Sequence, residues 1–145
     1  MCYKKTTIII LLLSISPMLY AQNISDYMWE NRLIILVDEH LETSAIRSQF
    51  NIFSKQTNTL LERDILLIQL TPKTALLGSS KKSTIAPTHI YKSLSISEGF
   101  TGVILVGKDG GIKLRKPFEV QAEDIFALID GMPMRKSEIK RKQGI

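Results

Sequence analysis

Cysteine is nearly absent from this sequence, because its 145 residues include a single cysteine, Cys2. Histidine is scarce as well, with only His40 and His89, so a zinc site would need carboxylates to complete its ligand set. Cys2 lies within a segment that we predict is removed, and a chain without it can form no disulfide and carry out no thiol catalysis. We therefore predict no metal site, no cofactor and no redox-active cysteine.

A long apolar run is also missing. Lys4 and Lys5 precede a short apolar run at residues 8–13, which is followed by Pro17 and then by the small residue Ala21. Even extended to Tyr20, this stretch is shorter than the roughly 18 residues that a membrane-spanning helix needs. The pattern predicts a signal peptide over residues 1–21 with cleavage after Ala21, and an uncleaved anchor is the alternative. We expect the protein to be exported, to the periplasm or outside the cell.

The positive charge is not spread along the chain. The formal net charge is +5, of which Lys4 and Lys5 contribute +2 and residues 135–145 contribute +4, so residues 22–134 carry −1. A basic domain suited to nucleic acid is therefore absent, and we predict no nucleic-acid partner. We expect a domain at 22–134 and a basic C-terminal tail at 135–145, which makes a weak contact with an anionic surface.

Short apolar runs and amphipathic stretches predict an α/β domain. We expect buried strands at 32–37, 65–70 and 102–106, an edge strand at 112–115, helices at 41–61, 87–94 and 121–130, and a mobile loop at 73–86. A strand–helix–strand unit gives a parallel pair, and the tight turn at 107–111 gives an antiparallel pair. The order β-α-β-α-β-β-α predicts a thioredoxin-like fold, a mixed four-stranded sheet flanked by helices.

The stretch GVILVGKDGG at residues 102–111 comes close to a phosphate-binding loop, because Gly102 and Gly107 flank four residues and Lys108 follows. Such a loop needs flexible residues between its glycines, whereas residues 103–106 are bulky or β-branched and favour a strand. Asp109 stands where a hydroxyl group is needed, and its charge would repel phosphate. Asp109 and Gly110 instead predict a β-hairpin turn, and we predict no nucleotide site.

The hairpin and the end of the last helix resemble a known family. Residues 107–115 (GKDGGIKLR), residues 129–135 (IDGMPMR) and Glu138 are similar to the P-DUDES domain, a domain of unknown function in secreted bacterial proteins and vertebrate sushi-repeat extracellular proteins. The similarity covers most of the chain, from Trp29 to Arg141. It implies a thioredoxin- or peroxiredoxin-like fold and no established activity.

In redox-active relatives of the wider fold, the nucleophilic cysteine follows the first strand. Residues 38–44 of this chain read DEHLETS, so that chemistry does not carry over. Ser44 lies near His40 but lacks the G-x-S-x-G elbow, and we predict no catalytic residue. Two hypotheses remain: a redox-silent module that binds a protein, peptide or envelope polymer, and a thiol-independent envelope enzyme of unknown reaction.

Charged residues of the hairpin and the last helix are the candidate binding residues. They are Lys108, Asp109, Lys113, Arg115, Asp130 and Arg135. Asp130 is expected to end the last helix, where its negative charge is unfavourable beside the helix dipole. We therefore predict that a cation pairs with Asp130, first Arg135 and next a hairpin lysine, and that this pair holds the M-P-M-R turn in place.

Overall fold

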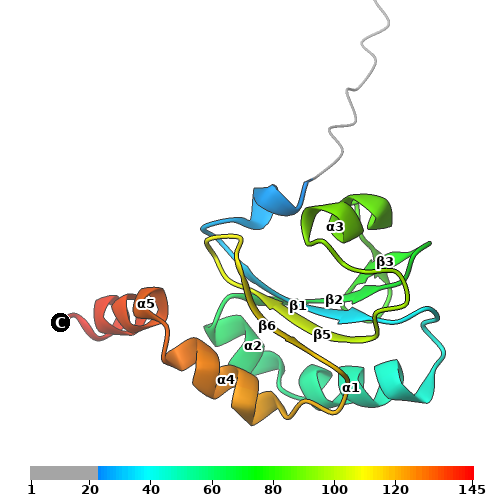
Figure 1. Ribbon diagram of the computed structural model, residues 1–145. Helices are drawn as coiled ribbons and strands as arrows, with labels where there is room; N and C mark the ends of the chain where they lie inside the picture. Colours follow the sequence, from blue (N-terminus) through cyan, green and yellow to red (C-terminus); the bar gives the residue numbers. More distant parts are fainter. Residues whose placement is uncertain (1–22) are drawn as a thin grey trace, which may run out of the picture.

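Six strands form one mixed sheet in the order β4–β3–β2–β1–β5–β6 (Figure 1). The computed structural model describes residues 23–145, so the predicted signal peptide at 1–21 lies outside the described residues. The strands are β1 (Arg32–Val37), β2 (Ile65–Leu70), β3 (Ala75–Leu77), β4 (Lys81–Lys82), β5 (Gly102–Val106) and β6 (Ile112–Lys116).

The centre of the sheet is built from three apolar strands, as the sequence predicts. β1 is parallel to β2 and antiparallel to β5, with Ile35 opposite Ile68 on one side and Ile104 on the other. Every residue of β1 and β5 is buried, because helices cover both faces of the sheet.

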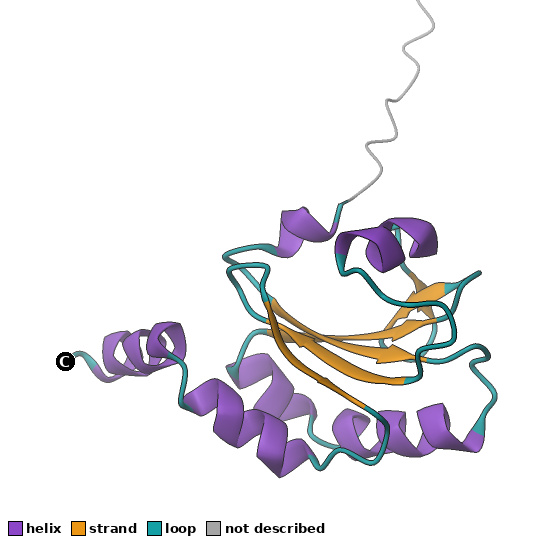
Figure 2. Cartoon of the chain, viewed as in Figure 1, coloured by secondary structure: helices purple, strands orange, loops and turns teal. Residues whose placement is uncertain are grey.

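Helices form a layer on each face of the sheet (Figures 1 and 2). They are the 3-10 helix η1 (Ile24–Tyr27), α1 (Ser44–Ser54), α2 (Thr57–Glu62), α3 (Pro87–Ser93), α4 (Ala122–Asp130) and α5 (Pro133–Gln143). The core between the sheet and α1, α2 and α4 contains Ile34, Phe53 and Phe126. The second core, which contains Ile35 and Ile90, lies under α3 and η1. These layers confirm the α/β class.

The predicted sheet of four strands is wrong, because β3 and β4 form within the segment predicted as a mobile loop at 73–86. The chain reverses at a turn in which the Thr71 N–H donates to the Thr74 carbonyl at 2.8 Å. β3 then pairs antiparallel with the outer edge of β2, and Ala75 is buried opposite Leu70. The polar composition of the loop concealed these strands, since only a short part of it enters the core.

The helix predicted over 41–61 is two helices. α1 ends at Ser54, and α2 begins at Thr57 after Gln56 leaves the helical conformation. The Thr57 hydroxyl donates to the Ser54 carbonyl at 3.0 Å, which satisfies an acceptor at the end of α1. The interruption lies at residues 55–56, and the residues that follow it, threonine and asparagine at 57–59, have low helix propensity and so favour a break over one continuous helix.

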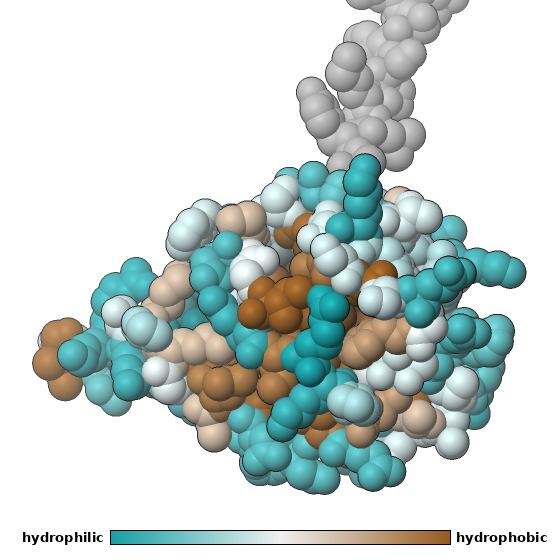
Figure 3. Space-filling model, viewed as in Figure 1, coloured by the Kyte–Doolittle hydropathy of each residue, from teal (hydrophilic) through white to brown (hydrophobic). Residues whose placement is uncertain are grey.

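The hairpin between β5 and β6 confirms the predicted turn. The Gly107 N–H donates to the Gly111 carbonyl at 2.8 Å, and Gly110 adopts φ +78°. β6 is the edge of the sheet, and it alternates the basic residues Lys113 and Arg115 with apolar ones. Apolar residues gather on the face that β6 crosses, with hydrophilic side chains lying over them (Figure 3). The charges of Lys113 and Arg115 protect this exposed edge from pairing with another chain.

Residues 135–145, predicted as a basic tail, lie largely in α5, which crosses the predicted boundary at residue 134. α5 follows α4 and extends away from the sheet (Figure 1). Arg135 and Glu138 are 1% and 6% exposed, so they anchor the helix, whereas its lysines face outward. The segment is therefore a packed helix with a basic outer face. Within residues 23–145, none of the helices has the length and apolar character needed to cross a membrane.

Candidate functional site

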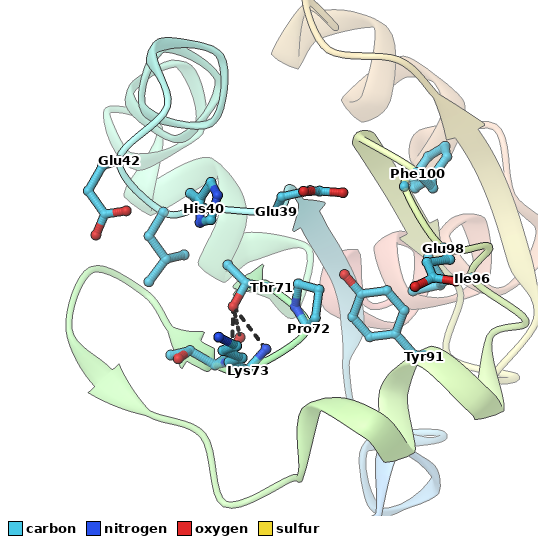
Figure 4. Close-up of a pocket in the computed structure, with 13 residues that line it drawn as sticks. Glu39, His40, Glu42, Thr71, Pro72, Lys73, Tyr91, Ile96, Glu98 and Phe100 are labelled. Carbon is cyan, nitrogen blue, oxygen red and sulfur yellow. Dashed lines mark hydrogen bonds between the residues drawn. The ribbon is translucent and has the colours of Figure 1, made fainter.

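A cleft of about 560 Å³ opens where the parallel strands β1 and β2 end (Figure 4). Residues 39–42 follow β1 and lead into α1, and residues 71–74 form the turn after β2. Tyr91 of α3 and Phe100 of the following loop lie on the other side of the cleft. The carboxyl ends of parallel strands are a common place for ligands in α/β proteins, because loops from neighbouring strands converge there.

Asp38 lies beside the cleft, directly after β1, and organises the start of α1. Asp38 is 7% exposed, and its carboxylate accepts hydrogen bonds from the Thr43 hydroxyl and from the Glu39 N–H. Thr43 in turn caps α1 by accepting from the Ile46 N–H at 3.3 Å. This arrangement holds residues 39–42 in a fixed loop along one wall of the cleft.

The opposite wall is aromatic and carries two polar groups, the Tyr91 hydroxyl and the Glu98 carboxylate (Figure 4). Burial first, and then the charges of Glu39 and Asp38, raise the pKa of the Tyr91 phenol. The Tyr91 hydroxyl is therefore neutral at physiological pH and able to donate a hydrogen bond. Phe100 contributes an apolar surface, and its ring also stacks with the guanidinium of Arg115, 5.8 Å from the ring centroid.

The charged side chains that line the cleft are unpaired. The carboxylates of Glu39, Glu42 and Glu98, the amine of Lys73 and the ring of His40 form no ion pair or side-chain hydrogen bond with another residue of 23–145. Three carboxylates against one lysine make the cleft acidic. A cleft with aromatic walls and free carboxylates can bind a cationic group that carries an apolar portion.

Among the described residues, the cleft contains no thiol and no cluster of side chains arranged to hold a metal ion. Residues 38–44, which begin at the end of β1, contain no sulfur, and the one cysteine of the chain is Cys2. Among the described residues, no three His, Cys, Asp or Glu side chains are grouped to hold a metal ion. His40 lines the cleft, whereas Ser44 lines a separate hollow with Gln49 and Phe118, so these two residues do not form a nucleophile–base pair.

Three of the candidate binding residues belong to a partly buried ionic cluster at the opposite end of the sheet. We define the cluster as Arg32, Glu62, Arg63, Asp64, Lys108, Asp130, Arg135 and Glu138. Lys108 contacts Asp64 and Glu138, each at 2.8 Å. The cluster holds four positive and four negative side chains, so its charges compensate one another and join α5 to the sheet.

The predicted pair between Asp130 and Arg135 is confirmed, with Arg135 Nε 3.2 Å from Asp130 Oδ1. Sequence reasoning missed Arg63, which binds both oxygens of the same carboxylate at 3.0 and 2.6 Å. Burial raises the pKa of Asp130, but the hydrogen bonds from Arg63 and Arg135 outweigh it and hold this pKa below its ordinary value. The second choice, a hairpin lysine, does not contact Asp130.

Of the remaining candidate residues, Asp109 and Lys113 lie together at the hairpin, and Arg115 lies apart from them. Asp109 pairs with Lys113 at 2.7 Å across the hairpin turn. Arg115 donates to the carbonyls of Leu94 and Ser95, at 2.6 and 3.2 Å, and so ties β6 to the loop after α3. The cleft residues were not predicted as a site. The available signal was their position, since residues 39–42 and 71–74 follow two strands that the sequence identifies as parallel neighbours.

Comparisons with known proteins agree with this architecture. Residues 23–138 match the family model described as a domain of unknown function (DUF4174). Among solved structures, the chain is similar to a thioredoxin peroxidase I of Plasmodium yoelii, with a TM-score of 0.54 and 16% sequence identity over 84% of this chain and 81% of the other. This likeness shows a thioredoxin-like fold. A comparison with curated proteins found no match.

Proposed function

We propose that this chain, which belongs to the DUF4174 family of domains of unknown function, is a redox-silent binding module that takes a basic peptide segment into its cleft. The fold is thioredoxin-like, and the position after β1 lacks the thiol on which redox chemistry depends. The hairpin and the M-P-M-R stretch support the narrower assignment to the P-DUDES domain.

The free carboxylates of the cleft are the observation that carries this proposal. In the ionic cluster, each charged side chain has a partner of opposite sign, so those charges serve packing. In the cleft, Glu39, Glu42 and Glu98 have none among the described residues, and they surround a volume large enough for one or two side chains. Charges that the fold does not use remain available to a ligand.

The chemistry of the walls supports a lysine or arginine side chain as the group that is bound. Its charged end would pair with Glu39 or Glu98, while its aliphatic stem would pack on Tyr91 and Phe100. An arginine would gain further from the aromatic faces, because a guanidinium stacks on them. The neutral Tyr91 hydroxyl can donate to a carbonyl of the bound peptide.

The test is an NMR titration of the purified protein with a short peptide that has a central Arg-Leu pair. The matched control peptide has citrulline, a neutral isostere, in place of arginine. We expect saturable shifts at residues 39–42, 71–74 and 91, and about tenfold weaker binding of the citrulline peptide, because two exposed ion pairs contribute up to about 1 kcal/mol each. Equal affinity for the two peptides would contradict the proposal.

Protein variants give the second arm of this test. Glu39→Gln combined with Glu98→Gln should weaken the arginine peptide about tenfold and leave the citrulline peptide unchanged. Glu30→Gln is the matched control, because Glu30 is an exposed carboxylate near the opposite end of β1 that has no ion-pair partner within residues 23–145. Equal weakening by the control would show that the effect is a general one of net charge.

Export and surface attachment belong to the same proposal. The signal-like pattern at residues 1–21 supports delivery to the periplasm or the exterior. The outer face of α5 carries Lys136, Lys140, Arg141 and Lys142, while the one acidic side chain of the helix, Glu138, is turned inward. An exposed helix face with four basic side chains and no acidic one supports a weak contact with an anionic envelope surface.

A further inference from the structure

A second hollow, of about 320 Å³, lies between the β5–β6 hairpin and the start of α5. Its polar lining consists of Arg32, Lys108, Lys113 and Asp109, and its apolar wall consists of residues 132–134. The hollow is at the end of the sheet opposite the cleft and shares no lining residue with it. Its chemistry is also opposite, since its lining carries three basic side chains and one acidic side chain.

The first turn of α5 faces this hollow without a cap. Met132 occupies the N-cap position with no side-chain hydrogen bond, and the first turn contains no acidic residue. Within the described part of the chain, no group accepts a hydrogen bond from the N–H of Met134 or Arg135. An uncapped start of an 11-residue helix attracts an anion, because these N–H groups and the helix dipole both favour negative charge.

Arg32 supplies an independent observation. This side chain lines the hollow, is 1% exposed, and its Nε is the one buried side-chain nitrogen or oxygen of the described residues that has no hydrogen-bond partner. Its other nitrogens donate to Glu138 and to the Arg63 carbonyl. A buried N–H without a partner is costly, and such a group commonly indicates a ligand or water that completes the site.

We propose that this hollow binds a small organic carboxylate, with the anionic group at Arg32 and the start of α5 and the apolar body against residues 132–134. The buried Lys108 adds positive potential behind the site, although Asp64 and Glu138 occupy its hydrogen bonds. Lys113 stands at the rim, 32% exposed, paired with Asp109. The apolar wall distinguishes an organic carboxylate from inorganic phosphate.

An NMR titration of the whole protein with hexanoate tests this assignment. Hexanamide is the matched control, since it has the same length and no charge. We expect hexanoate to give saturable shifts at the N–H groups of Met134 and Arg135 and at Arg32 Nε–H, and hexanamide to give none. Inorganic phosphate should displace hexanoate only in large excess. Equal binding of hexanamide, or displacement by equimolar phosphate, would overturn the proposal.

Two substitutions at the rim should change the affinity in opposite directions. Lys113→Gln should weaken hexanoate about fivefold, because it removes one exposed positive charge and frees the Asp109 carboxylate. Asp109→Asn should tighten hexanoate binding, since it removes the negative charge and keeps an oxygen that can accept from the Gly111 N–H. Lys116→Gln, on the same strand and outside the hollow, is the control and should have no effect.

Tighter hexanoate binding by Asp109→Asn cannot arise from a loss of folding. This variant therefore distinguishes an effect on the binding site from an effect on the stability of the fold. Thermal unfolding of each variant verifies that the fold is retained. Unchanged affinity in both rim variants would overturn the proposal. Failure of the peptide test at the cleft would leave this result unaffected, because the two sites have no residue in common.

Discussion

Glu138 offers the sharpest test of the ionic cluster, because three buried cations, Arg32, Lys108 and Arg135, share its carboxylate. Its oxygens accept from both terminal nitrogens of Arg32 at 3.2 Å and contact Lys108 Nζ at 2.8 Å. Replacement by glutamine preserves the size of the side chain and removes its charge. Arg32, 1% exposed, would then be a buried cation without a counter-ion in contact.

The expected cost follows from this geometry. Removing one partner of a buried ion pair costs about 3–5 kcal/mol, because the other charge stays desolvated. We expect the lower end, about 3 kcal/mol, since Lys108 retains Asp64 and Arg32 retains the Arg63 carbonyl. For a domain of this size, such a loss lowers the melting temperature by about 10 °C.

The assay is urea and thermal unfolding of Glu138→Gln at neutral pH, followed by circular dichroism. Glu30→Gln is again the matched control, because Glu30 is exposed and has no ion-pair partner among residues 23–145. The control should change the free energy of unfolding by less than about 0.5 kcal/mol. A Glu138→Gln variant as stable as its control would refute the view that the cluster anchors α5.

The pH dependence provides an independent check of the same residue. Burial raises the pKa of Glu138, but hydrogen bonds from Lys108 and Arg32 outweigh it and hold the pKa below the ordinary 4.5. The unfolded state therefore binds this proton first, so the stability that Glu138 contributes is present above pH 4.5 and is lost as the pH falls through the lower folded pKa. Glu138→Gln should show a shallower loss of stability in this acid range than the natural protein.

Three further predictions concern chemistry and location. Purified residues 22–145 should neither reduce insulin disulfides nor consume peroxide above a blank, because the chain downstream of Ala21 has no thiolate, and robust turnover in either assay would refute this. The intact mass of the exported protein should match a chain that begins at Gln22, whereas a mass that retains residues 1–21 would favour the uncleaved anchor. Binding to vesicles that contain anionic lipid should weaken with added salt. It should be lost when Lys136, Lys140 and Lys142 are replaced by serine, with the melting temperature nearly unchanged. Binding that is insensitive to both changes would contradict a role for α5.

Local sequence patterns determined the central part of this fold. Residues 32–37, 65–70 and 102–106 are predominantly apolar, with Arg32 and Gln69 as the polar members, and a run that must be covered on both faces becomes a central strand. The Asp109–Gly110 turn follows from backbone preferences that need no distant partner. The absence of sulfur after β1 is likewise a property of the sequence alone.

Of the two arginines that bind Asp130, only one could be predicted from the local sequence. Its place at the end of a helix predicts that it needs a cation, because the dipole acts within a single turn. Arg135, five residues away, could be named for the same reason. Arg63 could not, since 67 residues separate it from Asp130 and only the packing of α2 against α4 brings the two together.

Tertiary structure alone decided the two hollows and the edge of the sheet. β3 and β4 are too short to be identified as strands. β3 forms because the outer edge of β2 supplies hydrogen-bond partners, and β4 forms because the free edge of β3 does the same. The cleft joins residues 39–42, 71–74 and 91–100, and the second hollow joins a hairpin to the start of a helix. Local patterns encode burial and turn chemistry, whereas the distances between these segments depend on strand register and helix packing across the whole chain.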